Sequence, residues 1–179
     1  MEYTLNQLIN EWKVRKGIVP LRTDATITRQ DAFEIDEYIT RIIDSWYVKL
    51  LDTGPIEYLD VTDISSEVTI TAFSRGVATI QLPAHCRRVI EISMTEWQRP
   101  ATIVTDCGSH EARRQGSPFA RGGAVRPVAV VESAGTVRLY SFKTAPVIDR
   151  ILAVVTPRDG MYRCDPRALE SLFNTNDTF

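Results

Sequence analysis

The spacing of apolar residues changes once along this 179-residue chain, near residue 55, and that change limits the folds open to it. Before residue 55, apolar side chains recur every three or four positions, which is typical of helices that pack along one face. From residue 56 to about 157 they alternate with a period of two, which is typical of strands. The sequence therefore predicts helices followed by a β region.

The N-terminal part is predicted to hold two helices. Thr4 and Gln7 match a capping box, in which each side chain binds the other residue's backbone amide, and Gly17 ends the helix that follows. A second helix is predicted from Thr28 to about Asp52. Its apolar residues cover more than one side, so we expect it to lie at the centre of the fold or to meet a neighbouring subunit. They are Ala32, Phe33, Ile35, Tyr38, Ile39, Ile42, Ile43, Trp46, Tyr47, Val48, Leu50 and Leu51.

Short strands separated by turn residues are predicted between residues 56 and 157. Lengths and spacings of this kind favour an antiparallel β-sandwich or a small barrel. No Gly-rich turn joins a strand to a helix, so a doubly wound nucleotide-binding fold is not expected. The strands are expected at 68–72, 77–82, 88–94 and 101–105, and in the segments RPVAVVES, TVRLYSF and RILAVVTPR.

A short C-terminal helix is predicted to begin at Asp165-Pro166, with aspartate as the N-cap and proline at the first helical position. We therefore expect an α+β fold in three segments. Residues 1–55 form an N-terminal helical hairpin, and residues 56–160 form an antiparallel β region with a long arm at 106–126. Residues 161–179 form a C-terminal helix and tail that fold as one unit with 1–55.

The charge and composition bound the partners. The formal net charge is -2, so no field of the whole chain draws it to nucleic acid or to a membrane, and such a partner would need a local patch. No stretch approaches the roughly 20 apolar residues that span a bilayer. The start, MEYTLNQLIN, lacks the apolar core of a signal peptide, so neither a leader nor a membrane partner is expected. The three widely spaced cysteines suit free thiols in a reducing cytoplasm.

Candidate catalytic and metal-binding residues are few. His85 and Cys86 are adjacent, but neighbouring side chains on a strand or turn point apart, so a thiolate–imidazole pair is not expected. A zinc site at Cys107 and His110 would need other ligands, such as Cys164, to converge from distant segments. No serine lies in a G-x-S-x-G turn. We predict no catalytic residue, no metal ligand and no cofactor, and a protein that is not an enzyme.

Residues 106–126, here called the arm, are the most unusual part of the sequence. They have no clear period, and loops of this length inside compact domains are usually functional or disordered. One interpretation is a mobile, solvated hairpin loop. The other is an arm that becomes ordered against a partner, with an aromatic anchor and basic residues that meet acidic side chains or phosphates. The candidate contact residues for protein or DNA are Arg113, Arg114, Phe119, Arg121 and Arg126.

The order of these elements resembles a known family. A helix over Thr28–Trp46 precedes a β unit with the motif IQLP at 80–83 and the basic, apolar strand RRVIEI at 87–92, and a short helix closes the chain. This order resembles the head–tail adaptors of short-tailed phages. They are the tail tubular A-like and gatekeeper-type ring proteins below the portal, and they include ring proteins of crAss-like phages. The resemblance covers about two thirds of the chain in element order.

The resemblance implies a structural role in the virion, at the neck or tail, with assembly in the host cytoplasm. Such proteins form rings, often dodecamers, that extend the DNA channel below the portal protein, help to retain packaged DNA and receive a tail component or second ring protein. Ring contacts are heterologous, because one face of each subunit meets a different face of the next. If the arm faced the lumen of such a ring, its arginines would contact DNA without reading its sequence.

Two other functions remain open. The chain is alternatively a small β-sandwich module that binds carbohydrate or protein, with a site lined by Trp97, Phe119, Tyr140 and Phe142. Tyr140 and Phe142 are two residues apart on one predicted strand, so they are expected to share a face and to pack in the core. A hydrolase or nuclease subunit is the third possibility, against which stand the two histidines and the missing carboxylate–metal motif.

Overall fold

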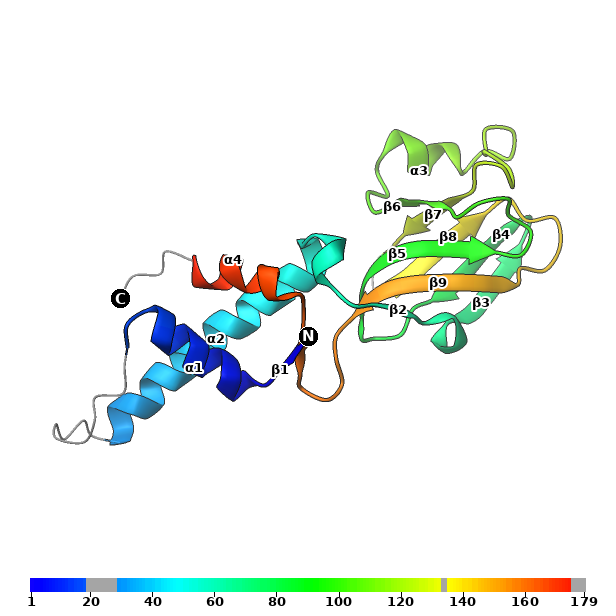
Figure 1. Ribbon diagram of the computed structural model, residues 1–179. Coiled ribbons are helices and arrows are strands. Elements are labelled where there is room, and N and C mark those ends of the chain that lie inside the picture. Colours follow the sequence, from blue (N-terminus) through cyan, green and yellow to red (C-terminus); the bar gives the residue numbers. More distant parts are fainter. Residues whose placement is uncertain (19–28, 133–134, 175–179) are drawn as a thin grey trace. The chain divides into compact units, whose positions relative to one another are not determined.

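The computed structural model describes residues 1–18, 29–132 and 135–174, without the side chains of 29–34. It confirms the α+β fold: a pair of N-terminal helices in contact, several antiparallel sheets that do not close into a barrel, and a short C-terminal helix. The chain divides into two compact units (Figure 1). We call residues 1–60 with 157–179 the helical unit, and residues 61–156 the β unit.

The helical unit begins as predicted. Helix α1 (Leu5–Arg15) is capped by Thr4, whose Oγ1 accepts a hydrogen bond from the Gln7 amide at 3.3 Å, while Gln7 Oε1 accepts one from the Thr4 amide at 2.8 Å. Gly17 follows with φ +71°, a left-handed conformation that suits glycine at a helix end. The link expected at 18–27 lies outside the described residues except for residue 18, and the start signal at Thr28 lies outside them as well.

Helix α2 (Arg29–Thr53) is the centre of the helical unit, as its broad apolar surface predicted. Trp46 Nε1 donates a hydrogen bond to Ser171 Oγ at 2.8 Å, which ties α2 to the C-terminal helix α4 (Leu169–Phe173). Tyr47 Oη accepts one from the Arg163 amide at 2.9 Å. Helices α1 and α2 are in contact, and Leu8 and Trp12 of α1 and Leu172 of α4 are buried. The described buried side chains of α2 are Ile39, Ile43, Trp46, Tyr47, Leu50 and Leu51.

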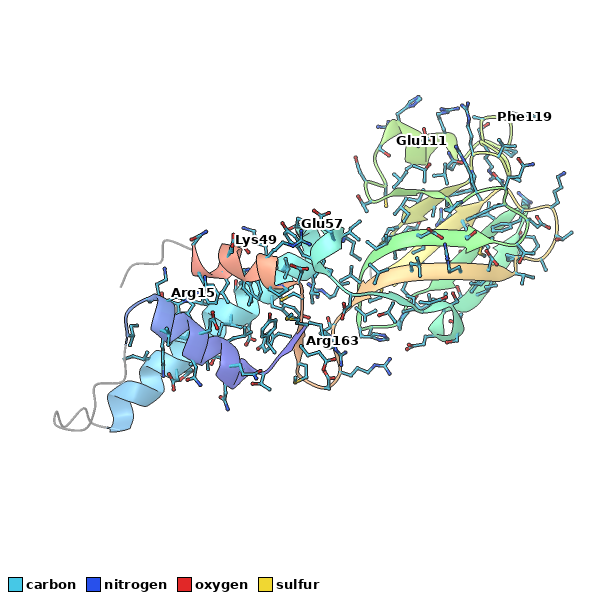
Figure 2. All side chains as sticks on the ribbon, in the orientation of Figure 1. Arg15, Lys49, Glu57, Glu111, Phe119 and Arg163 are labelled. Carbon is cyan, nitrogen blue, oxygen red and sulfur yellow. The ribbon has the colours of Figure 1, made fainter. Side chains whose placement is uncertain are left out.

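Short elements join the two chain segments of the helical unit. Strand β1 (Glu2–Tyr3) pairs antiparallel with β10 (Tyr162–Arg163), whose Arg163 is labelled in Figure 2. The 3-10 helices η1 (Ile56–Tyr58) and η4 (Pro166–Ala168) flank the β unit in the sequence. Asp165 caps η4, because its Oδ1 accepts from the Arg167 amide at 2.9 Å, as the Asp-Pro signal predicted. Residues 175–179 of the expected tail lie outside the described part of the chain.

The β unit consists of two sheets. The larger has the strand order β3-β4-β8-β7-β6, and the smaller has the order β2-β9-β5. A short 3-10 helix, η2 (Ser65–Glu67), joins β2 to β3. The strands of the larger sheet are β3 (Thr69–Ser74), β4 (Val77–Gln81), β6 (Thr102–Val104), β7 (Val128–Val131) and β8 (Thr136–Tyr140); those of the smaller are β2 (Val61–Asp63), β5 (Cys86–Met94) and β9 (Ile148–Val155).

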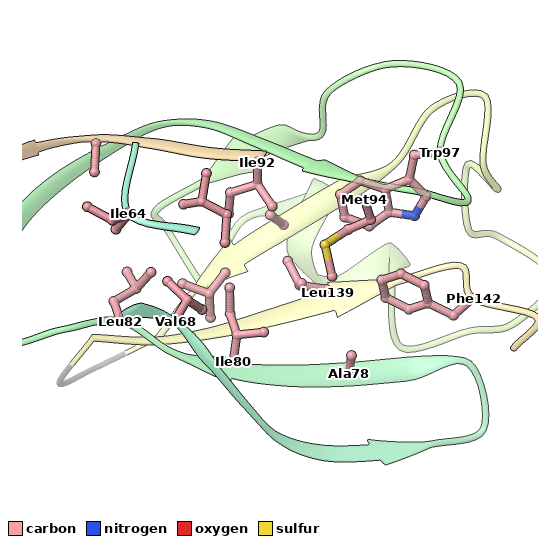
Figure 3. Packing of buried hydrophobic residues seen from close by; sticks show 14 residues of the cluster. Ile64, Val68, Ala78, Ile80, Leu82, Ile92, Met94, Trp97, Leu139 and Phe142 are labelled. Atoms are coloured by element: carbon pink, nitrogen blue, oxygen red, sulfur yellow. The ribbon is translucent and has the colours of Figure 1, made fainter. Parts of the chain in front are cut away.

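One hydrophobic core fills the space between the two sheets (Figure 3). Ile80 and Leu139 of the larger sheet and Ile92 and Ile151 of the smaller sheet are fully buried in it. Burial of such a side chain contributes about 1.5–3 kcal/mol. Because both inner faces contribute to one cluster, the β unit is a sandwich, the first of the two predicted architectures. The cluster contains Ile64, Val68, Ala78, Ile80, Leu82, Ile92, Met94, Trp97, Ala129, Val137, Leu139, Phe142, Ile151 and Ala153.

Two features of the sheets differ from the prediction. β6 pairs with β7 in parallel, through Thr102 with Val128 and Val104 with Val130, so the β region is not wholly antiparallel. Strand β2 was also not predicted, since its three side chains are all exposed and leave no apolar alternation to detect. It pairs with β9 at one edge of the smaller sheet.

We predict that Trp46→Ala lowers the free energy of unfolding by about 3–5 kcal/mol, because it removes a large buried ring. Trp46 is 9% exposed, whereas Val48 on the same helix is 47% exposed. Val48→Ala is therefore the matched control, and we expect it to change stability by less than about 0.5 kcal/mol. Chemical denaturation followed by circular dichroism measures both, and equal effects would contradict the assignment of the buried face of α2.

Candidate partner-binding surface

The arm connects two parallel strands. It leaves β6 at Val104 and enters β7 at Val128, and parallel strands require the chain to cross back from one end of the sheet to the other. A hairpin loop joins antiparallel neighbours, so the hairpin interpretation of the arm is wrong. The crossover carries helix α3 (His110–Arg114), whose N-cap Ser109 accepts a hydrogen bond from the Ala112 amide at 3.2 Å.

The arm packs on the outer face of the larger sheet. Ala112 of α3 is buried against Val128, Val130 and Tyr140, which form a second, smaller hydrophobic cluster. β7 is therefore buried on both faces, because Ala129 between these valines belongs to the core of the sandwich. Burial on both faces is typical of strands in parallel pairs, and here the arm supplies the cover.

Gln115 is a second anchor of the arm that the sequence analysis did not identify. It is 1% exposed, and its Nε2 donates a hydrogen bond to the Glu111 backbone carbonyl at 3.3 Å. Ala112 and Gln115 lie three residues apart and so share the inner side of this turn of chain. The sequence signal that could have found this anchor is a helix cap at Ser109 followed by Ala112 and Gln115 three residues apart. The signal is weak because the helix is only five residues long.

Arg121 holds the arm to the rest of the β unit. Its Nε donates to the Gln115 carbonyl at 2.8 Å, and its Nη1 donates to the Arg75 carbonyl at 3.3 Å in the turn between β3 and β4. Its Cζ also lies 5.4 Å from the centre of the Tyr140 ring, within the range of a cation–π contact. Arg121 is thus the predicted contact residue whose recorded hydrogen bonds reach a loop outside the arm.

The other predicted contact residues lie at the surface of the arm. Arg113 donates two hydrogen bonds to the Gly108 carbonyl, at 2.9 and 2.6 Å, and Arg114 Nη1 lies 3.6 Å from Glu111 Oε2. Arg126 is exposed. Phe119 is 100% exposed at the end of the arm, as Figure 2 shows. The structure brings these residues onto one segment but does not gather their side chains into a single pocket.

His85 and Cys86 do not form a reactive pair. Cys86 opens β5 after a turn in which its amide donates to the Pro83 carbonyl at 2.9 Å, and its side chain packs against the sandwich core. Burial raises the pKa of the Cys86 thiol to about 11, so the thiol is protonated at neutral pH. His85 Nε2 lies 3.7 Å from Glu67 Oε2 instead.

Neither a metal site nor a membrane span was found in the described part of the chain. No group of three or more His, Cys, Asp or Glu side chains there is placed to hold a metal ion. None of the described helices is both long enough and apolar enough to cross a bilayer.

The aromatic residues of the alternative carbohydrate site do not line a common surface. Trp97 and Phe142 stack at 5.3 Å inside the sandwich core, and Tyr140 is buried on the opposite face, under the arm. The prediction that Tyr140 and Phe142 share a face is therefore wrong. Its physical reason is Ser141, whose φ of +75° breaks the alternation between them. Of the four predicted aromatics, Phe119 alone is exposed.

The sequence matches no protein-family model, and a search of curated proteins finds no match.

We predict that Arg121→Ser costs about 1–3 kcal/mol of stability, because it removes two charge-assisted hydrogen bonds and a cation–π contact. Arg126→Ser is the matched control on the same arm, and we expect it to stay within about 0.5 kcal/mol of the wild type. Urea denaturation of both variants measures the difference. If Arg121→Ser were as stable as the control, Arg121 would not anchor the arm.

We predict that thiol alkylation at pH 8 modifies Cys107 first, because Cys107 is exposed. Burial raises the pKa of Cys86 and of Cys164 from the ordinary 9.0 to about 11. That shift lowers their thiolate fraction about a hundredfold at this pH. It also makes the fold lose stability as the pH rises from 9 to 11, since the unfolded thiols release their protons first. Mass spectrometry of iodoacetamide-treated protein gives the order in which the three cysteines are alkylated. Rapid alkylation of Cys86 would contradict this prediction and would indicate that His85 and Cys86 form a reactive pair.

Proposed function

We propose that this chain is a structural protein of a virion: a ring-forming head–tail adaptor that sits below the portal protein, extends the DNA channel and joins the tail. In this proposal it is not an enzyme and carries no cofactor. Its partners are other copies of itself, often twelve in a ring, the portal protein, and a tail or second ring protein. Its place is the neck or tail of the particle, assembled in the host cytoplasm.

The arrangement of the chain supports this proposal. A helix pair, a β unit that contains the LP motif before a basic apolar strand, and a closing helix follow one another in the order that the resemblance requires. Leu82 is buried in the sandwich core and β5 is the strand that follows, so these motif residues belong to the frame of the β unit. The likeness is one of order, and the proposal rests chiefly on the arm.

The observation that carries the proposal is a fully exposed aromatic side chain on an anchored support. Phe119 is 100% exposed, yet the arm that presents it is fixed by Ala112, Gln115 and Arg121. A large apolar side chain held out in water gains free energy when a partner covers it, and aromatic anchors with flanking arginines are typical of interface centres. In a ring-forming adaptor, such a group would be covered by the neighbouring subunit or by the next ring.

We predict that a variant with Phe119→Ser and with Arg113, Arg114 and Arg126 replaced by serine folds normally but fails in assembly or genome retention. These side chains are exposed, and exposed loop charges contribute little to stability. Complementation in infected cells, scored by the number of DNA-filled particles, measures the effect. Val125→Ser, also exposed on the arm, is the control. Normal particles from the fourfold variant would refute a role for the arm.

The location of the protein tests the proposed function itself. Mass spectrometry of purified particles is expected to find the chain in a fixed number of copies per portal, and electron microscopy is expected to place it in the neck or tail. Its absence from particles would overturn the proposal whatever the arm does. Both measurements are made on assembled particles and do not depend on the behaviour of the isolated chain.

A further inference from the structure

The two units of the chain carry opposite charge. The helical unit contains 15 acidic residues and 10 Lys or Arg, a formal net charge of -5, whereas the β unit contains 8 acidic residues and 11 Lys or Arg, a net charge of +3. The total of -2 conceals this separation. Surfaces of opposite sign on one chain provide the complementarity that an interface between unlike faces needs.

The free positive charge of the β unit gathers around one groove. The groove occupies about 640 Å³ where β4 begins and β8 ends, and we call it the basic groove. Arg75, Arg121 and Lys143 line it. Within residues 61–132 and 135–156, the cations without a recorded side-chain hydrogen bond or ion pair are Arg75, Lys143, Arg99 and Arg126. Arg99 and Arg126 belong to adjoining loops, which are joined by a hydrogen bond from the Gln98 amide to the Ala124 carbonyl at 3.0 Å.

The one acidic residue of the basic groove is already engaged. The Glu96 carboxylate accepts hydrogen bonds from the Lys143 amide at 2.9 Å and the Thr144 amide at 3.0 Å, and from the Thr144 hydroxyl. The hydroxyl contact and then the Lys143 amide hold the pKa of Glu96 below its usual range. Glu96 thus fixes the segment after β8. Its charge also acts on Lys143, but its oxygens are occupied by backbone amides and the Thr144 hydroxyl, and no ion pair between Glu96 and a cation of the groove is recorded.

The backbone around the basic groove is strained. In the described chain, two residues other than glycine have positive φ, Arg75 at +52° and Ser141 at +75°, and both line this groove. Arg75 is explained by the two-residue turn that it forms with Gly76 between β3 and β4. Ser141 has no such explanation, and its Oγ is buried without a hydrogen-bond partner. Residues held in this region of φ cluster at ligand and partner sites.

We propose that the basic groove receives carboxylate side chains from the helical unit of a second copy of this chain. The proposal rests on the proposed function only in that copies meet through unlike faces. A guanidinium and an ammonium side by side match carboxylates, and the acidic helical unit of the next copy supplies them. The exposed acids of the described helical unit that have no recorded side-chain hydrogen bond or ion pair are Glu57, Asp60 and Glu170.

Two variants test the contact from its two sides. The groove variant carries Arg75→Glu and Lys143→Glu, and the acid variant carries Glu57→Lys, Asp60→Lys and Glu170→Lys. We expect the wild type to associate with increasing concentration and each variant alone to associate at least about tenfold more weakly, because one face of every copy is repelled. An equimolar mixture of the two is expected to associate again, starting from a one-to-one dimer, because the intact acids of one variant meet the intact groove of the other. The reversed groove and the reversed acids also carry opposite charge, so they do not oppose this dimer. Analytical ultracentrifugation measures all four samples.

The matched control is Arg138→Glu with Arg150→Glu, which makes the same change of charge on the β unit away from the groove. These two arginines pair with Glu132 and Glu91. Circular dichroism confirms that each variant is folded before it is compared. We expect this control to associate far more strongly than the groove variant. If both variants associated equally weakly, the effect would come from the net charge of the β unit and the proposal would be overturned.

Three further results would overturn the proposal. The first is a wild type that remains a monomer up to about 1 mM, where even weak interfaces associate. The second is a mixture that gives no dimer. The third is a groove variant that loses binding of a short DNA duplex at low salt while its self-association is unchanged, which would make nucleic acid the partner. If the mixture forms a dimer but the protein is absent from particles, this contact is supported and the proposed function is refuted. If the protein is present in particles but the mixture forms no dimer, the proposed function is supported and this contact is refuted.

Discussion

The parallel pairing of β6 with β7 is the constraint on which the surface of the β unit depends. Antiparallel neighbours can be joined by two residues, but a parallel pair forces the chain to return over one face of the sheet. The residues that make this return must cover β7 and must therefore carry their own anchors. Ala112, Gln115 and Arg121 provide them. Phe119 is therefore exposed on a segment that is anchored because it covers β7.

The same end of the sandwich joins the arm to the basic groove. Arg121 contacts the turn at Arg75, and both residues line the groove beside the segment that follows Ser141. The aromatic anchor and the unpaired cations therefore belong to connected loops rather than to separate features. An apolar anchor supplies free energy on contact, while charges around it select the partner and speed the encounter. The two proposals assign these two tasks to neighbouring parts of one unit.

The sequence predicted the elements better than their connections. Capping residues at Thr4 and Asp165 are local signals, so these two helix starts were found, whereas the start of α3 at Ser109 was missed. Alternation located the buried strands for the same reason. The direction of β6 could not be predicted, because three residues carry no information about whether a neighbour runs parallel. For the candidate site, the arginines were identified by type, but only the contacts of Arg121 distinguish a fold-supporting arginine from exposed ones. The reversal of faces at Ser141 depends on one backbone angle that the residue type does not disclose.

The helical unit is made from two stretches of chain with the whole β unit between them, and this has a consequence for synthesis on the ribosome. The sandwich is complete once residue 156 has emerged, whereas α4, which covers Trp46 and its neighbours, follows later. Domains generally fold as they emerge from the ribosome. The apolar faces of α1 and α2 are therefore expected to stay exposed to solvent while the β unit folds. We therefore expect the nascent chain to be most prone to misassociation before residues 157–173 have been translated.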